Sequence, residues 1–259
     1  MARFGNVEYE VKDGIAFMTL DEEARLNALS QEIKDGLKRG FDEIERDDDV
    51  WLAILTGKGR AFCAGADIRG LHHEDPLAVK RFMHDVVGGV LSRAERLSKP
   101  VIAAVNGLAL GGGFELAISC DIIIASDKAQ FGVPEAKLGL VPGFAIVRLP
   151  EIVGRHKSKE LIMTTETISA EEALHIGLIN KIVPHEKLME EAVAMAKRIM
   201  ESPKLTIWFA KSSVNRHIYM GGEELSYAID AMPYLFSTED AKEGIKAFLE
   251  KRKPSFKGK

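Results

Sequence analysis

Two glutamates lie next to turn-forming residues, where a carboxyl group could take part in proton transfer. Glu115 follows the cluster Gly111-Gly112-Gly113 within an apolar segment, and Glu135 directly follows Pro134. Burial raises the pKa of a carboxyl group, whereas the N-terminus of a helix lowers it. Two such groups that face one substrate could therefore divide the acid and base roles of a reaction.

Each glutamate also has an interpretation without catalysis. Proline followed by glutamate is ordinary at the start of a helix, and Glu115 could pair with a basic residue of the core. The spacing alone does not decide between these interpretations.

The glycine cluster is itself a candidate anion site. The apolar run Val101–Val105 leads through Asn106-Gly107 to the three glycines, and a helical pattern follows. Glycine lets a ligand approach the backbone closely, and the first N–H groups of a helix have no intrahelical partner. We therefore expect donors for an anion or a developing oxyanion here. A sharp turn that needs only flexible residues is the other interpretation.

A second loop could supply a further donor. Gly59–Asp67 follows the apolar run Val50–Thr56 and contains mainly small side chains. Small side chains would admit a ligand to the backbone, where one N–H group could bind an oxyanion. A plain connection between a strand and a helix is the alternative for this loop.

The elements that would position these loops alternate between strand and helix patterns. Strands are expected at Val7–Val11, Ile15–Leu20, Val50–Thr56, Val101–Val105 and Asp121–Ala125, and helices at Ser30–Arg46, Leu77–Leu97 and Phe114–Ser119. Later helical patterns cover Glu186–Met200, Lys204–His217, Glu223–Ala231 and Glu239–Lys251. The alternation predicts an α/β fold with mostly parallel strands over residues 1–198, and the later patterns predict a helical C-terminal region over residues 199–259.

Composition excludes several classes of protein. Of 259 residues, 46% are hydrophobic and 29% charged, and 35 basic against 39 acidic residues give a net charge of −4, which speaks against a dedicated nucleic-acid binder. The two cysteines have no CxxC spacing, and His72, His73 and His84 show no ligand spacing, so no disulfide and no metal site are expected. We find no signal peptide and no membrane-spanning run, and we expect a cytoplasmic protein.

Taken together, the motifs resemble those of the crotonase family, also called the enoyl-CoA hydratase/isomerase superfamily. The matching segments, in family order and spacing, are Ala61–Ile68, Lys99–Gly113, Cys120–Ile122, Ala129–Gly132, Pro134-Glu135, Leu138–Gly143, Phe236–Asp240 and Glu243–Phe248. The resemblance implies a spiral of ββα units whose C-terminal helical region joins subunits into a homotrimer or homohexamer. It further implies an acyl-CoA thioester substrate and hydration of a 2-enoyl-CoA to a 3-hydroxyacyl-CoA. No separate cofactor is implied, because coenzyme A is part of the substrate.

The resemblance also implies roles for individual residues. The N–H groups of Ala66 and Gly112 would form the oxyanion hole, Glu135 would exchange a proton at Cα, and Glu115 would activate the attacking water. The residues expected to bind the substrate are Arg25, Ala28, Ala64, Asp67, Ile68, Arg69, Gly143, Phe248 and Lys251. The basic tail that starts at Lys251 would lie near the CoA nucleotide.

One segment departs from the family pattern and keeps other activities open. Phe144–Leu149 replaces a glycine-rich sequence and is one residue shorter, at the start of a helix beside the expected acyl pocket. An isomerase, another acyl-CoA enzyme of this family and a non-catalytic CoA-binding protein are alternatives. An RNA-binding member is disfavoured, because the helix Ser30–Arg46 mixes basic with acidic residues.

Overall fold

The computed structural model describes the chain except residues 69–74, 203, 220–232, 234–235 and 256–259. Its centre is a seven-stranded sheet in the order β1-β2-β3-β4-β6-β8-β11. These strands are β1 (Ala2–Phe4), β2 (Val7–Lys12), β3 (Ile15–Leu20), β4 (Leu52–Gly57), β6 (Val101–Val105), β8 (Ile122–Ser126) and β11 (Lys181–Val183). The pairs β1–β2 and β2–β3 are antiparallel, and every later pair in this sheet is parallel.

A smaller, second sheet carries the loops of the candidate site. Its order is β10-β9-β7-β5, and its strands are β5 (Ala61–Cys63), β7 (Leu108–Leu110), β9 (Gln130–Gly132) and β10 (Thr167–Ser169). Strands β5, β7 and β9 run parallel, and β10 is antiparallel to β9. Each strand has only three residues, which is too short for a periodic pattern, and the sequence analysis did not predict this sheet.

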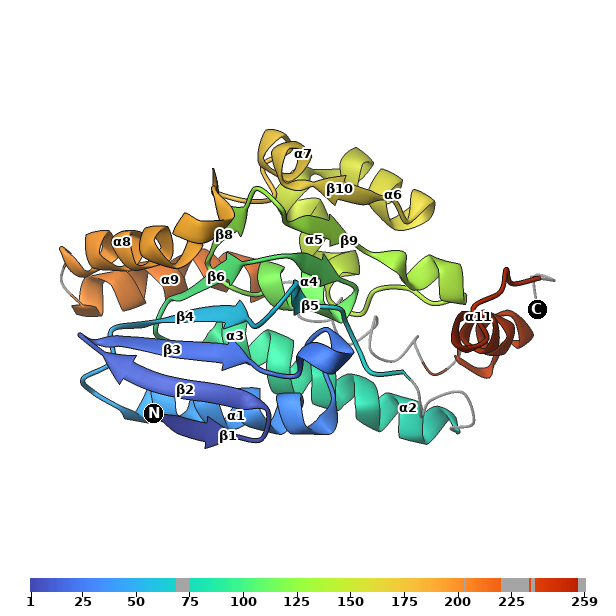
Figure 1. The fold of residues 1–259 in the computed structure, drawn as a ribbon, viewed down its shortest axis with the longest axis horizontal. Coiled ribbons are helices and arrows are strands. Elements are labelled where there is room, and N and C mark those ends of the chain that lie inside the picture. The colour runs from blue at the N-terminus through green and yellow to red at the C-terminus, as the bar shows by residue number, and fades with distance from the viewer. Residues whose placement is uncertain (69–74, 203, 220–232, 234–235, 256–259) are drawn as a thin grey trace.

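Helices cover both faces of the large sheet (Figure 1). The longer helices are α1 (Gln31–Arg46), α2 (Pro76–Met83), α5 (Ala145–Val153), α6 (Arg155–Thr164), α8 (Leu188–Met200), α9 (Lys204–Tyr219) and α11 (Glu239–Leu249). The shorter ones are α3 (Ser92–Arg96), α4 (Gly112–Ile118), α7 (Ala170–His175), the π-helix η3 (His84–Leu91) and the 3₁₀ turns η1 (Glu23–Arg25), η4 (Pro134–Leu138) and η5 (His185–Lys187).

Alternate strand residues point to different cores, as the two-residue period of a strand requires. Ile54 and Ile102 pack with α8 on one face, whereas Leu55 and Ala103 belong to the larger core that contains the buried side of α1. Both faces of the central strands are therefore buried, which explains their continuous apolar sequence.

Most expected elements are confirmed, and the predicted α/β class with mostly parallel strands is correct. The helix expected over Leu77–Leu97 is wound in three parts, because the π-helix η3 separates α2 from α3. The pattern at Glu223–Ala231 lies outside the described residues. The boundary expected at residue 198 falls inside α8, which packs on the sheet, and the division into two domains stays a prediction. In the described part of the chain, no helix is long and apolar enough to cross a membrane.

Candidate active site

The candidate donors belong to two peptide groups, Gly65–Ala66 and Gly111–Gly112, in adjacent loops. The carbonyl oxygen of each peptide accepts a backbone hydrogen bond. Leu29 N donates to Gly65 O over 2.8 Å, and Glu115 N donates to Gly111 O over 2.9 Å. In a trans peptide the N–H points opposite to the C=O, so the N–H of Ala66 points away from Leu29 and the N–H of Gly112 points away from Glu115 N. A Cβ placed on Gly112 would lie 3.2 Å from Ala66 N, which shows how closely the two donors approach.

Glycine is required in these loops by geometry rather than by flexibility alone. Gly65 has φ +104° and Gly111 has φ +53°, values that residues with a side chain rarely adopt. A Cβ on Gly113 would lie 1.9 Å from Cys63 O. The loop after β5 and the start of α4 can therefore pack backbone against backbone, which brings the two candidate donors together.

Glu115 is buried on α4 and caps a different helix. Its Oε1 accepts hydrogen bonds from Phe144 N at 2.6 Å and Ala145 N at 2.8 Å, at the start of α5. Burial raises the pKa of Glu115, and the backbone N–H groups partly oppose that rise by favouring the anion. Among the described residues Glu115 forms no ion pair, so the alternative of a basic partner in the core is not supported.

Glu135 lies on η4 and has few polar contacts of its own. Its Oε2 is buried and accepts no hydrogen bond from any described residue, and its Oε1 would lie 3.1 Å from a Cβ on Gly111. Burial is the larger cause that raises the pKa of Glu135, and the negative charge of Glu115 raises it further. The two carboxyls and the two N–H donors therefore share one site, in which one glutamate can hold a proton while the other is ionised.

The atypical segment forms the start of α5 and lies against α2 and η3. A Cβ on the buried residue Gly143 would lie 2.5 Å from Met83 Cε and 3.0 Å from Val87 Cγ2. Phe144 is fully buried, so its ring is part of the core beneath the site. The backbone of this segment, rather than its side chains, supplies the groups that contact Glu115.

A buried ion pair anchors α5 to the rest of the molecule. Arg148 Nε donates to Glu95 Oε1 at 2.8 Å, and Arg148 Nη2 donates to Glu95 Oε2 at 3.3 Å. Both side chains are almost completely buried. The sequence gives no sign of this pair, because 53 residues separate the two partners and neither stands in a catalytic pattern.

Four of the residues expected to bind substrate lie in the loop that carries Ala66 or in the segment beside it. Ala64, Asp67 and Ile68 are half-buried in the loop that carries Ala66, and Ala28 is half-buried in the neighbouring segment, where Ala64 N donates to Leu26 O at 3.0 Å. Arg25 is exposed and forms an ion pair with Glu22 at 3.0 Å. Arg69 lies outside the described residues.

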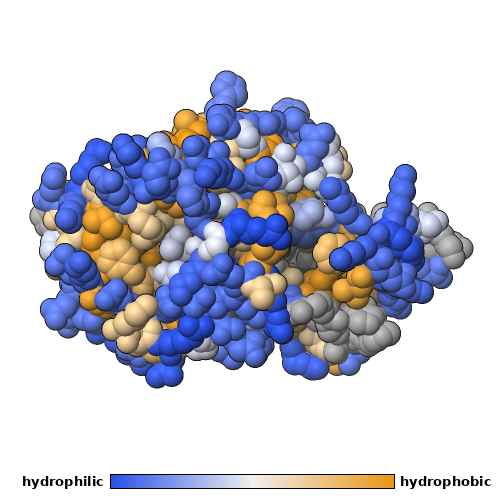
Figure 2. Space-filling view, in the orientation of Figure 1, coloured by the Kyte–Doolittle hydropathy of each residue, from blue (hydrophilic) through white to orange (hydrophobic). Residues whose placement is uncertain are grey.

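The C-terminal residues lie on α11 and just after it. Phe248 is 60% exposed and, with Leu138 of η4, lines a recess of about 270 Å³. Figure 2 shows apolar surface where α11, on the right of the view, meets the body of the molecule. Lys251 is exposed, whereas Arg252 of the basic tail is bound by Glu243 at 2.6 Å. The tail therefore offers fewer free cations than its sequence suggests.

No metal site is found among the residues that the structure describes. Within the described ranges, no group of three or more His, Cys, Asp or Glu side chains could hold an ion. The expectation that the protein needs neither metal nor separate cofactor stays a prediction.

Comparison with known proteins assigns the chain to a family. A family model described as Enoyl-CoA hydratase/isomerase matches residues 10–259. The chain is 42% identical over 252 residues to the short-chain-enoyl-CoA hydratase of Clostridium acetobutylicum, covering 96% of each chain. It is 38% identical to the crotonyl-CoA hydratase of Syntrophomonas wolfei, covering 98% of each.

Solved structures agree with these sequence relatives. A crystal structure of carnitinyl-CoA hydratase from Mycobacterium avium is similar with a TM-score of 0.88 and 35% identity, covering 98% of this chain and 99% of that one. The fold and the site thus define a crotonase-type protein. The chain belongs to the enoyl-CoA hydratase/isomerase family, as the sequence motifs predicted.

Proposed function

We propose that this protein adds water across the double bond of a 2-enoyl-CoA to give a 3-hydroxyacyl-CoA, and that it catalyses the reverse reaction. The observation that carries this proposal is the juxtaposition of two backbone N–H donors with two buried carboxyls. Hydration of a conjugated thioester needs a base for water, an acid for Cα and donors for the enolate oxygen. The family and the named relatives, several of them enoyl-CoA hydratases, support the same reaction.

The unequal hydrogen bonding of the two glutamates assigns their charges. Glu115 accepts N–H groups at the N-terminus of α5, which favour its anion, whereas Glu135 Oε2 accepts none from the described residues. Two neighbouring buried carboxylates repel each other, so the first ionisation favours Glu115 and keeps the proton on Glu135. Glu115 is then the base for water, and Glu135 is the acid for carbon.

The reaction follows from this division. The thioester oxygen accepts hydrogen bonds from Ala66 N and Gly112 N, and Glu115 removes a proton from water as the water oxygen bonds to Cβ. The electron pair of the double bond moves to the thioester oxygen, and the two N–H groups stabilise the resulting enolate. The enolate takes the proton of Glu135 at Cα, which restores the thioester. Transfer of a proton from Glu115 back to Glu135 then resets the site.

Crotonyl-CoA gives a direct test. The purified protein should remove the absorbance of the conjugated enoyl thioester and produce a thioester heavier by one water molecule. Supplying 3-butenoyl-CoA tests the isomerase alternative, which needs a proton acceptor and donor but no attacking water. Conversion of 3-butenoyl-CoA to crotonyl-CoA without hydration of crotonyl-CoA would replace the proposed activity by isomerisation.

We further propose that the protein assembles as a homotrimer or homohexamer. This is supported by α9, where Leu205 and Phe209 lie four residues apart on one side of the helix and are 72% and 76% exposed. Such an apolar helix face is typical of a surface that another subunit covers. Light scattering of the purified protein tests this state, and a monomer would contradict it. The expected cytoplasmic location stays a prediction.

A further inference from the structure

We propose that Asn27 positions the Ala66 N–H of the oxyanion hole, and that it does so by joining the segment that contains Arg25 and Ala28 to the loop that leads to Ala66. This inference rests on the proposed function of the site. Asn27 is buried, bonds only to backbone groups and acts through them. It is therefore a positioning residue.

The side chain of Asn27 is fully buried and all its hydrogen bonds go to backbone groups. Its Oδ1 accepts from Glu22 N at 2.8 Å, and its Nδ2 donates to Lys58 O at 2.9 Å and Ala61 O at 2.8 Å. One amide thus connects residues before η1 with both ends of the turn between β4 and β5. A buried amide with these partners is costly to remove, because the backbone groups would lose their partners.

The backbone at this point is strained, which indicates that the side chain holds it. Leu26 and Asn27 both have φ +54°, in the left-handed region that residues with a side chain rarely adopt. Such conformations persist only where surrounding contacts fix them. Asn27 supplies three of those contacts itself.

The fixed segment holds the donor peptide directly. Leu26 O accepts from Ala64 N at 3.0 Å, and Leu29 N donates to Gly65 O at 2.8 Å. The second bond sets the plane of the Gly65–Ala66 peptide and hence the direction of the Ala66 N–H. If Asn27 no longer held this segment, the peptide could rotate, and the donor would lose its alignment with the thioester oxygen.

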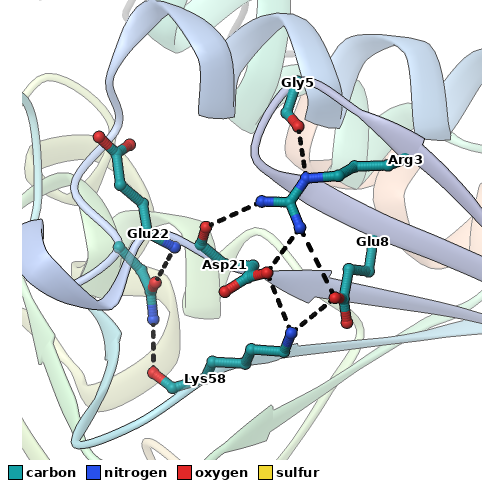
Figure 3. A network of polar contacts seen from close by, with 7 residues as sticks. Arg3, Gly5, Glu8, Asp21, Glu22 and Lys58 are labelled. Carbon is teal, nitrogen blue, oxygen red and sulfur yellow. Dashed lines mark hydrogen bonds and ion pairs between the residues drawn. The ribbon is translucent and has the colours of Figure 1, made fainter.

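The other side of the turn is anchored independently. Lys58 Nζ contacts Glu8 Oε1 at 2.6 Å and Asp21 Oδ2 at 3.0 Å (Figure 3). The Lys58 carbonyl accepts from Asn27 Nδ2. Asn106 Nδ2 also donates to Ala61 O, at 3.3 Å. Because these contacts remain without Asn27, its removal should release the segment at residues 26–29 more than the turn at residues 58–61.

Asn27→Gly tests the proposal, because glycine accepts the positive φ while all three side-chain hydrogen bonds are lost. The probe is cinnamoyl-CoA, a conjugated thioester whose absorbance moves to longer wavelength when donors polarise its carbonyl. At saturating protein, we expect the variant to show less than half the wild-type shift. We expect kcat for crotonyl-CoA to fall about 10- to 100-fold, since complete loss of one oxyanion donor costs about 10²–10³.

Thr56→Val is the matched control. It removes one buried side-chain hydrogen bond, from Thr56 Oγ1 to Ala104 O at 2.8 Å, without touching either segment. The control should retain the wild-type shift and kcat even if its thermal stability is lower. Should Asn27→Gly fail to fold, Asn27→Ser, which retains one donor, is measured in the same way with a smaller expected loss.

The measurement separates this inference from the function on which it rests. A wild-type protein that neither shifts the spectrum nor hydrates crotonyl-CoA overturns both. If the Asn27 variant shows the wild-type spectral shift at saturation, the positioning role of Asn27 is overturned and the proposed function stands. This holds even if the variant binds cinnamoyl-CoA more weakly. In that case Asn27 would order only the segment at residues 25–28.

Discussion

The surroundings of Glu115 and Glu135 show how one site can give two carboxyls different roles. Both side chains lie in apolar surroundings, and burial raises the pKa of both. The Glu115 region provides N–H groups from the start of α5, whereas the Glu135 region leaves Oε2 without a partner among the described residues. Burial makes both protons available near neutral pH, and the hydrogen bonds decide which carboxyl holds the charge.

The largest effect should come from the Glu135 region. Glu135→Gln removes the proton donor for Cα, and general acid catalysis contributes about 10²–10⁴-fold to rate. We expect kcat for hydration of crotonyl-CoA to fall about 10³–10⁴-fold with little change in KM. Steady-state kinetics measures this, and a variant within tenfold of the wild type would contradict the role of Glu135.

Glu115→Gln should cause a smaller loss, about 10²–10³-fold in kcat, because the amide oxygen can still accept the two α5 N–H groups and hold a water molecule. The same variant should not gain isomerisation of 3-butenoyl-CoA as its hydration rate falls. Hydration that persists at the wild-type rate would mean that Glu115 has only a structural role.

Arg148→Met perturbs the Glu115 region without changing either catalytic carboxyl. It leaves the buried carboxylate of Glu95 without the guanidinium, at a cost of about 3–5 kcal/mol in the free energy of unfolding. We expect kcat to fall, because α5 shifts relative to Glu115. The fall should be smaller than in Glu115→Gln, because the carboxylate of Glu115 remains. The double variant Glu95→Met/Arg148→Met should recover most of the stability in chemical denaturation. If the double variant is as unstable as the single one, the lost ion pair is not the cause.

Metal removal should have the smallest effect. The two glutamates can transfer every proton of the proposed reaction, and the two backbone N–H groups can stabilise the enolate charge. Dialysis against EDTA should leave kcat and KM for crotonyl-CoA unchanged. Activity that disappears with EDTA and returns with a divalent cation would show that the two regions do not suffice.

The positions of some site residues could be predicted from local sequence motifs. A strand, three glycines and a helix are consecutive in the chain, so the place of Gly112 and Glu115 follows from the sequence. The contacts that distinguish the two carboxyls are distant in sequence: 29 residues separate Glu115 from Phe144. Phe144 contributes a backbone N–H, which every residue but proline has, and its side-chain type gives no signal.

Asn27 illustrates a different limit. Its partners Lys58 and Ala61 are 31 and 34 residues away and contribute carbonyl oxygens, so only the folded chain reveals the three hydrogen bonds. Its neighbours Arg25 and Ala28 were expected to bind substrate, but sequence alone could not separate a residue that contacts substrate from one that shapes the backbone. The short strands of the second sheet were missed because three residues carry no measurable period.

The pH dependence of kcat/KM for crotonyl-CoA, compared between the wild type and Glu115→Gln, tests the division of charge most directly. The wild type should give a bell-shaped profile: activity rises as Glu115 ionises and falls as Glu135 loses its proton, both above the ordinary range of carboxyl pKa values. In Glu115→Gln the acid limb should disappear. The alkaline limb should move to lower pH, because the negative charge that raises the pKa of Glu135 is gone. An alkaline limb that stays in place, or an acid limb that persists, would contradict the account.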